Sequence, residues 1–127
     1  MRGLGGTALD LNDAIRKHAE WKFKFRNALH DGTALDAGAI STDNNCEFGK
    51  WLHGEARQAF GEEKAYPTCV AEHAAFHRAA GKVALAVNAK QKEQVEKLIA
   101  PGSEFAETSK KVSVAIIELQ NASRKVA

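Results

Sequence analysis

The chain has 127 residues, of which 44% are hydrophobic and 27% charged, and its formal net charge is +2. That length suits one domain with its own core, and the composition is that of a folded globular protein. The near-balanced charge argues against a dedicated nucleic-acid binder, and two cysteines are too few for a disulfide framework.

No apolar run is long enough for a membrane span, and the first ten residues lack the apolar segment of a signal peptide. We therefore expect a cytoplasmic protein without a transmembrane segment. Strand patterns are nearly absent, whereas helix-forming residues and helical spacings of apolar residues are frequent. All the predicted elements are consequently helices.

The first predicted helix spans about residues 7–29, after a flexible lead-in over residues 1–6. Thr7 and Asp10 fit a helix N-cap signature. Phe23 lies off the apolar stripe, where it faces either a partner or a second side of the core. The stripe itself, at spacings of three and four, should face the core: Leu11, Ala14, Ile15, His18, Trp21, Phe25, Ala28 and Leu29.

A loop is predicted over residues 33–45, followed by a short helix that starts near Cys46 and fades at Gly54. Asp43 or Asn44 would cap this helix. A turn of helix and a second loop then lead to the next long helix.

This second long helix is expected over about residues 68–88, where Gly81 in mid-helix predicts a close approach of another helix. Its inner stripe comprises Val70, His73, Ala74, His77, Ala80, Gly81, Ala84 and Val87. A short helix over residues 91–99 should follow.

The last predicted helix begins with Ser103 as its N-cap. Val114 and Ile117 add a second apolar edge to it, which either extends the core or marks a dimer face. The sequence thus predicts one all-α domain over residues 1–127, an antiparallel four-helix bundle with an additional short helix.

Three histidines point to a metal site. The spacing of His73 and His77 places both imidazoles on one helix face, where two rings can grip one metal ion. His18 lies inside the apolar stripe of the first helix. Buried without a metal, each ring would need its own hydrogen-bond partner, whereas one metal ion would satisfy all three. Ordinary core histidines are the alternative, and His30 and His53 are expected to be solvated.

A cysteine supplies a fourth donor. Cys46 opens a short helix, where the helix dipole should favour the thiolate form that binds metals. One thiolate and three neutral imidazoles are a donor set typical of zinc, and they leave no open position for a catalytic water. We therefore expect a sensory or structural site and no enzymatic activity. Cys69 remains an alternative sulfur ligand, a resolving thiol for oxidised Cys46, or a plain core residue.

Three motifs follow one another along the chain: His18-x-x-Trp21, Cys46-x-Phe48-Gly49-x-Trp51 and His73-x-x-x-His77. Together they resemble the chemoreceptor zinc-binding (CZB) domain family. The segment Pro101-Gly102-Ser103-Glu104-Phe105-Ala106 is similar to the segment that leads into that family's last helix, so the resemblance covers nearly the whole chain. It implies that one Zn²⁺ per chain is bound by His18, Cys46, His73 and His77, with Trp21, Phe48, Gly49 and Trp51 packed around the site.

The resemblance also implies a regulatory or sensory domain of bacterial signalling, which acts in chemotaxis or cyclic-di-GMP control and is partnered by a chemoreceptor or a diguanylate cyclase. Its signal would be the zinc level or oxidation of the Cys46 thiolate, and the chain would form a homodimer. One alternative is a structural module in which zinc clamps a dimerisation bundle. Another is a hemerythrin-like di-iron oxygen binder, which is disfavoured because no Asp or Glu lies four residues after His18, His73 or His77.

Overall fold

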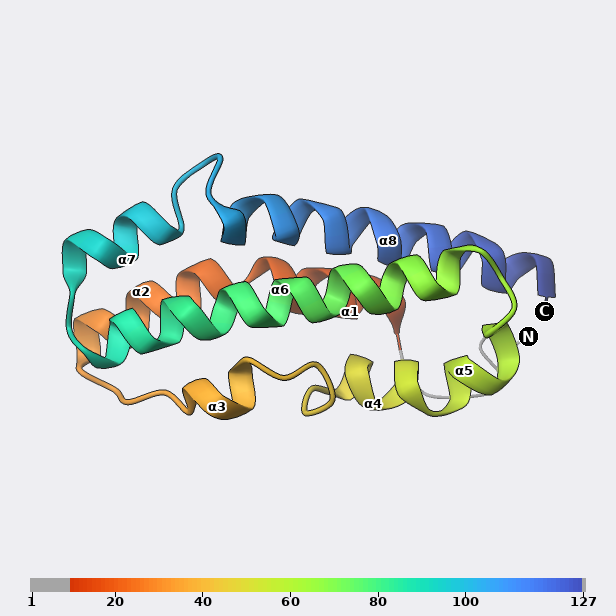
Figure 1. Ribbon diagram of the computed structural model, residues 1–127, viewed down its shortest axis with the longest axis horizontal. Helices are drawn as coiled ribbons and strands as arrows, with labels where there is room; N and C mark the ends of the chain where they lie inside the picture. The colour runs from red at the N-terminus through yellow and green to blue at the C-terminus, as the bar shows by residue number, and fades with distance from the viewer. Residues whose placement is uncertain (1–9, 127) are drawn as a thin grey trace.

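The computed structural model describes residues 10–126 and shows a bundle of helices (Figure 1). Three long rods run side by side: α1 (Leu11–Ala19) continued by α2 (Trp21–Asp31), then α6 (Ala65–Asn88), and α8 (Glu104–Val126). No strand occurs within the described residues. The predicted all-α helical bundle is confirmed.

The first rod differs from its prediction at its start. Asp10 has an extended backbone and caps α1, since its side chain accepts hydrogen bonds from the N–H groups of Asn12 and Asp13. The helix therefore begins at Leu11, later than predicted, while Thr7 and the lead-in over residues 1–6 lie outside the described residues. The rod is also interrupted at Glu20, whose carbonyl accepts from both Phe23 and Lys24.

A fourth rod is built from short helices in succession. These are α3 (Ala37–Ile40), α4 (Glu47–His53) and α5 (Glu55–Phe60). The helix α3 packs on the side of α6 away from α8, whereas α5 contacts α8 (Figure 1). The prediction of a continuous loop over residues 33–45 was wrong, because α3 forms within it. Asp36 caps α3 by accepting from the Ala39 N–H. The short helices α4 and α7 (Lys92–Leu98) lie where they were predicted, and α5 forms where a turn of helix was expected.

The central helix of the fold is α6, which packs against α2, α3, α7 and α8. It starts at Ala65, three residues earlier than predicted, and so contains Pro67. Proline is tolerated there because the first N–H groups of a helix have no intrahelical acceptor. Since neighbours surround it, α6 buries more than the one predicted stripe; Cys69, Phe76, Ala79, Val83 and Ala86 are buried as well.

The last helix begins as predicted, with the Ser103 hydroxyl accepting from the Ala106 N–H. At the centre of the bundle, Phe105 from this helix stacks near Phe25 of α2 and Phe76 of α6, each ring centroid 5.5 Å away. Val114 and Ile117 are 54% and 44% exposed, so they do not extend the core. None of the described helices is long and apolar enough to cross a membrane.

Candidate metal centre

Four donor side chains meet inside the bundle from three separate elements. His18 comes from α1, Cys46 from the N-cap of α4, and His73 and His77 from α6. One ligand atom from each of the four lies within 4.8 Å of all the others. The three histidines are at most 4% exposed, whereas Cys46 is only partly buried. The structure therefore brings together all four predicted metal-binding residues.

Four of the six distances between donor atoms are close to those around a tetrahedrally coordinated zinc ion. The Nε2 atom of His73 is 3.1 Å from that of His18 and 3.1 Å from that of His77. The Sγ atom of Cys46 lies 3.4 Å from His73 Nε2 and 3.6 Å from His77 Nε2. Around zinc, bonds of about 2.05 Å to nitrogen and about 2.3 Å to sulfur place tetrahedral N and N about 3.3 Å apart, and N and S about 3.6 Å apart.

Backbone carbonyls orient two of the rings. His18 Nδ1 is 2.7 Å from the Ala14 oxygen, and His77 Nδ1 is 2.9 Å from the Ile40 oxygen. A carbonyl only accepts, so Nδ1–H donates in both rings and each Nε2 presents a lone pair to the centre. The Nε2 of His73 carries at most one proton, so it cannot donate to the Nε2 atoms of His18 and His77 at once. The buried Nδ1 of His73 has no hydrogen-bond partner among the described residues. One cation satisfies the converging lone pairs better than any proton arrangement does.

Burial keeps the imidazoles neutral. Loss of solvation lowers the pKa of His18 to about 4 and that of His73 to about 2, and it lowers the pKa of His77 as well. The neutral ring is the form that coordinates a metal, so these histidines need not lose a proton at neutral pH.

The state of Cys46 differs from the prediction. Burial raises the pKa of its thiol, and the opposing effect of the Gly49 N–H, which donates to Sγ over 3.3 Å, is smaller. The expected helix-dipole preference for thiolate is therefore outweighed by desolvation. Cys46 is itself the N-cap of α4, so the predicted caps Asp43 and Asn44 were wrong. A metal ion is the charge partner that would stabilise the thiolate here.

Aromatic rings enclose the donors. Phe48 lies edge-on to His18 and His73, with ring centroids 5.8 and 5.0 Å away. Trp51 packs on Phe48, while Trp21 is half-buried and packs on Phe25. Phe48, backed by Trp51, therefore covers the donors on one side.

Gly49 is required by close packing. A Cβ there would lie 1.8 Å from the Asp43 carbonyl oxygen and 3.2 Å from Cε1 of His73. Only glycine lets α4 approach the loop and the ring this closely.

Two contributors to the site were not predicted. Phe76 lies between the two α6 histidines, with its ring 5.2 Å from His18 and 5.4 Å from His77. The apolar side chain of Phe76 could have indicated a place in the core, but only if α6 had been expected to be buried on several faces. The Ile40 carbonyl has no signal in the sequence, since any residue carries one. His53 is exposed, as expected, and its Nε2 lies 2.8 Å from Asp43 Oδ2. His30 is exposed, as expected.

A small hollow of about 160 Å³ reaches the centre from outside, lined by both His18 and Cys46. Lys17 lies beside it and links the two helices at its rim, with Nζ 3.2 Å from Asp13 and 3.3 Å from Glu47. His73 and His77 do not line this hollow. From this side, Cys46 and His18 are the donors that a small molecule meets.

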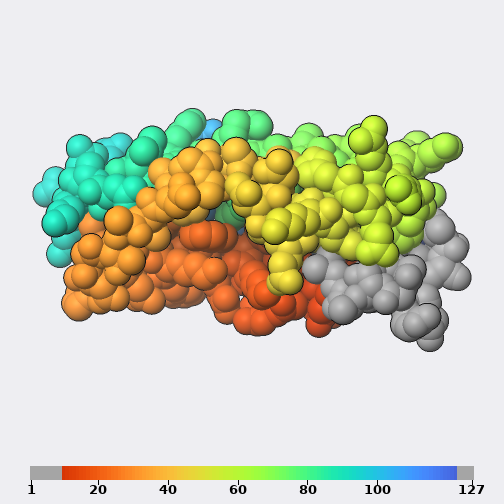
Figure 2. Space-filling view, turned by 90° about the horizontal axis from the view of Figure 1, so that it is seen from below, coloured from red at the N-terminus to blue at the C-terminus, as the bar shows by residue number. Residues whose placement is uncertain are grey.

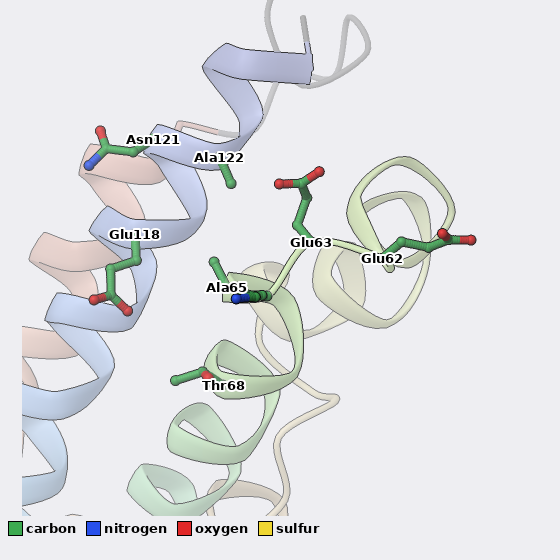
Figure 3. A pocket seen from close by; sticks show the side chains of 8 residues that line it. Glu62, Glu63, Ala65, Thr68, Glu118, Asn121 and Ala122 are labelled. Atoms are coloured by element: carbon green, nitrogen blue, oxygen red, sulfur yellow. The ribbon is translucent and has the colours of Figure 1, made fainter.

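A larger surface hollow of about 630 Å³ lies elsewhere (Figure 3). Glu63 points across it towards α8, whereas Glu62 points away from α8. None of the four donor residues lines it. Its residues are Glu62, Glu63, Lys64, Ala65, Thr68, Glu118, Asn121 and Ala122.

The donor group distinguishes between the earlier alternatives. Among the described residues, the sulfur that joins the histidines is that of Cys46, and Cys69 is not in the group. Cys69 is fully buried, and burial raises its thiol pKa to about 12. No carboxylate belongs to the group either, although di-iron centres in helical bundles are built on carboxylates.

Over residues 10–126, fold and site together define a helical bundle in which three histidines and one cysteine are grouped as candidate ligands of one metal ion. The sequence model of the chemoreceptor zinc-binding domain family matches residues 18–84, more than half of the chain, and the protein belongs to this family. The family binds zinc, and the group in this chain is positioned to hold one metal ion. The match ends before residues 101–106, so their resemblance stays a prediction. Searches of curated proteins and of solved structures each found no significant match.

Proposed function

We propose that the chain is a zinc-binding regulatory domain of a bacterial signalling system, in which His18, Cys46, His73 and His77 hold one zinc ion. The observation that carries the proposal is the convergence of their four donor atoms within 4.8 Å. All four positions of a tetrahedral ion are then supplied by protein, which supports a non-catalytic role.

The architecture supports a switch at Cys46. This residue is the least buried of the four, it lines the small hollow, and it caps the seven-residue helix α4. The two histidines on α6, in contrast, lie on a 24-residue helix that has eleven buried residues. Loss of the Cys46–zinc bond would free a short element and leave the long helices packed. Either a fall in zinc or oxidation of the thiolate would break that bond.

Oxidant treatment of the zinc-loaded protein tests this proposal. Hypochlorous acid converts a thiolate to a sulfenic acid and releases chloride, which removes the soft sulfur ligand. We expect about one zinc per chain to appear on a chromogenic chelator, and a thiol reductant to restore binding. Cys69→Ala is the matched control and should release zinc in the same way. Retention of zinc after Cys46 has been oxidised would favour a purely structural ion.

A homodimer is the second part of the proposal, and here a structural clamp is the competing function. Val114 and Ile117 form an exposed apolar edge on α8, and Phe23 on α2 is 60% exposed. Sedimentation should give twice the chain mass, and Val114→Glu should shift it to the monomer. Ala59→Glu, on the exposed side of α5, is the control. A dimer whose sedimentation is the same with and without zinc, and before and after oxidation, would favour the structural clamp.

The partner and the place of action follow from the family. We propose a chemoreceptor or a diguanylate cyclase as the regulated partner, in the cytoplasm, and residues 1–127 as a single domain. A domain of this kind acts by changing helix packing at an interface, so its output depends on the protein to which it is joined or bound.

A further inference from the structure

The segment that delivers Cys46 to the metal centre is bound along α6. We call residues 33–46 the strap. It leaves α2 after Gly32, whose backbone is left-handed, and it runs opposite in direction to α6. Figure 2 shows it on the surface between α1–α2 and α6.

The far end of the strap is held by Asn88, the last residue of α6. The Leu35 N–H donates to Asn88 Oδ1 over 2.8 Å, and Asn88 Nδ2 donates to the Leu35 carbonyl over 2.8 Å. A side-chain amide carries a donor and an acceptor side by side, so it pairs with both main-chain groups of one residue. The Asn88 side chain is exposed to solvent, and we call its pair of hydrogen bonds to Leu35 the clasp.

The middle of the strap rests directly on the α6 backbone. A Cβ on Gly81 would lie 2.5 Å from the Cβ of Ser41 and 3.0 Å from its Cα. Gly81 was predicted to mark a close approach of a helix, and the neighbour is instead Ser41, the C-cap of α3. Only glycine at position 81 lets the strap approach the helix backbone this closely.

The near end of the strap reaches the metal centre twice. The Ile40 carbonyl accepts from Nδ1 of His77, which aims the Nε2 of that ring, and Cys46 supplies the sulfur. A shift of the strap would therefore misplace two of the four donors together. Positions 77, 81 and 88 are four and seven residues apart, so all three contacts lie on one face of α6.

We propose that Asn88 is a positioning residue of the zinc centre. It lies eleven residues from His77, about 16 Å along the helix axis, and it acts through the strap rather than by touching the site. By clasping Leu35 it fixes the register in which Ile40 meets His77 and Cys46 meets the ion. The inference rests on the proposed function, because it takes these residues as zinc ligands.

Metal affinity and cobalt spectra of the whole chain test it. Zinc affinity is measured by competition with a chromophoric chelator, and bound Co²⁺ reports sulfur coordination through its thiolate charge-transfer absorption. Asn88→Ala should weaken zinc binding about tenfold or more, as loss of an indirect partner of a metal site does, and should weaken the cobalt–thiolate band. Asn88→Asp keeps the acceptor for the Leu35 N–H and should be affected less.

Two matched controls separate this role from general stability. Asn27→Ala makes the same change at an exposed position of α2 and should bind zinc as the original chain does. Gly81→Ala should weaken binding by pushing the strap away, whereas Gly38→Ala should not, because the nearest atom to its Cβ lies 3.6 Å away.

The outcomes are distinct. If Asn88→Ala binds zinc with unchanged affinity and an unchanged cobalt spectrum, the inference is overturned and the proposed function stands. If the original chain fails to bind zinc through Cys46, both are overturned. Circular dichroism of the zinc-free variants shows whether the helices persist. If Asn88→Ala loses its helices, the zinc affinity and cobalt spectrum of Asn88→Asp test the inference in its place: weaker zinc binding supports it, and unchanged binding overturns it.

Discussion

Replacing Cys46 by alanine is expected to reduce zinc affinity by more than the roughly 10- to 100-fold that loss of an indirect partner costs a metal site. Cys46 supplies the single anionic donor, and no other sulfur belongs to the donor group within the described residues. Three neutral imidazoles would remain, a weaker set that leaves one position to water.

The same change should remove the stabilisation that zinc gives to folding. A ligand present at 1,000 times its dissociation constant stabilises the folded state by about 4 kcal/mol. For a domain of this size that corresponds to a rise in Tm of roughly 10–20 °C. Calorimetry with and without zinc should show this rise in the original chain and only a fraction of it in Cys46→Ala.

Cys69→Ala is the control for this experiment. Its loss creates a cavity and lowers Tm, since Cys69 is fully buried, but the increment produced by zinc should persist. If the increment instead disappears with Cys69 and survives in Cys46→Ala, the assigned sulfur ligand is wrong.

Mild acid should unfold the zinc-free protein. Burial lowers the pKa of His18 from 6.5 to about 4, so the unfolded chain binds a proton in this window that the folded chain does not. Stability is complete above pH 6.5 and falls as the pH drops towards 4, by about 3 kcal/mol from this residue alone. The lowered pKa values of His73 and His77 act in the same direction. A domain with roughly 5–15 kcal/mol of stability would lose much of it.

Denaturant titrations between pH 7 and pH 4.5, with a chelator present, measure this effect. His18→Gln should reduce the slope of stability against pH, because it removes one of the buried groups. Asn27→Ala should leave the slope unchanged, since Asn27 is exposed and its side chain does not titrate. Equal stability at pH 7 and pH 5 would contradict the assignment of three buried, neutral histidines.

The sequence was informative where chemistry recurs at a fixed spacing. His73 and His77 share a face because they are four residues apart, and His18 was conspicuous as a polar residue within an apolar stripe. The bundle followed from the same periodicity. Short helices could not be predicted from the periodicity of apolar residues. The four residues of α3, which include Gly38, complete barely one helical turn, so the sequence shows no repeat of apolar positions there.

Other features depend on tertiary contact alone. The cap of α4 was assigned to Asp43 or Asn44 because these residue types are strong caps, yet the sulfur of Cys46 accepts the Gly49 N–H instead. The thiol pKa was judged from the helix end, and burial reversed its direction. The hydrogen bond between His77 and the Ile40 carbonyl involves a main-chain oxygen, on which side-chain identity has no bearing.

The wide separation of the donors along the chain has a consequence for how the protein folds. His73 and His77 meet within one helix, but His18 lies 55 residues before His73, and Cys46 lies 27 residues before it. Such distant groups meet only after long loops have closed, which is a late and slow event. Zinc therefore completes the fold and does not nucleate it: its binding energy retards unfolding and leaves the rate of folding almost unchanged.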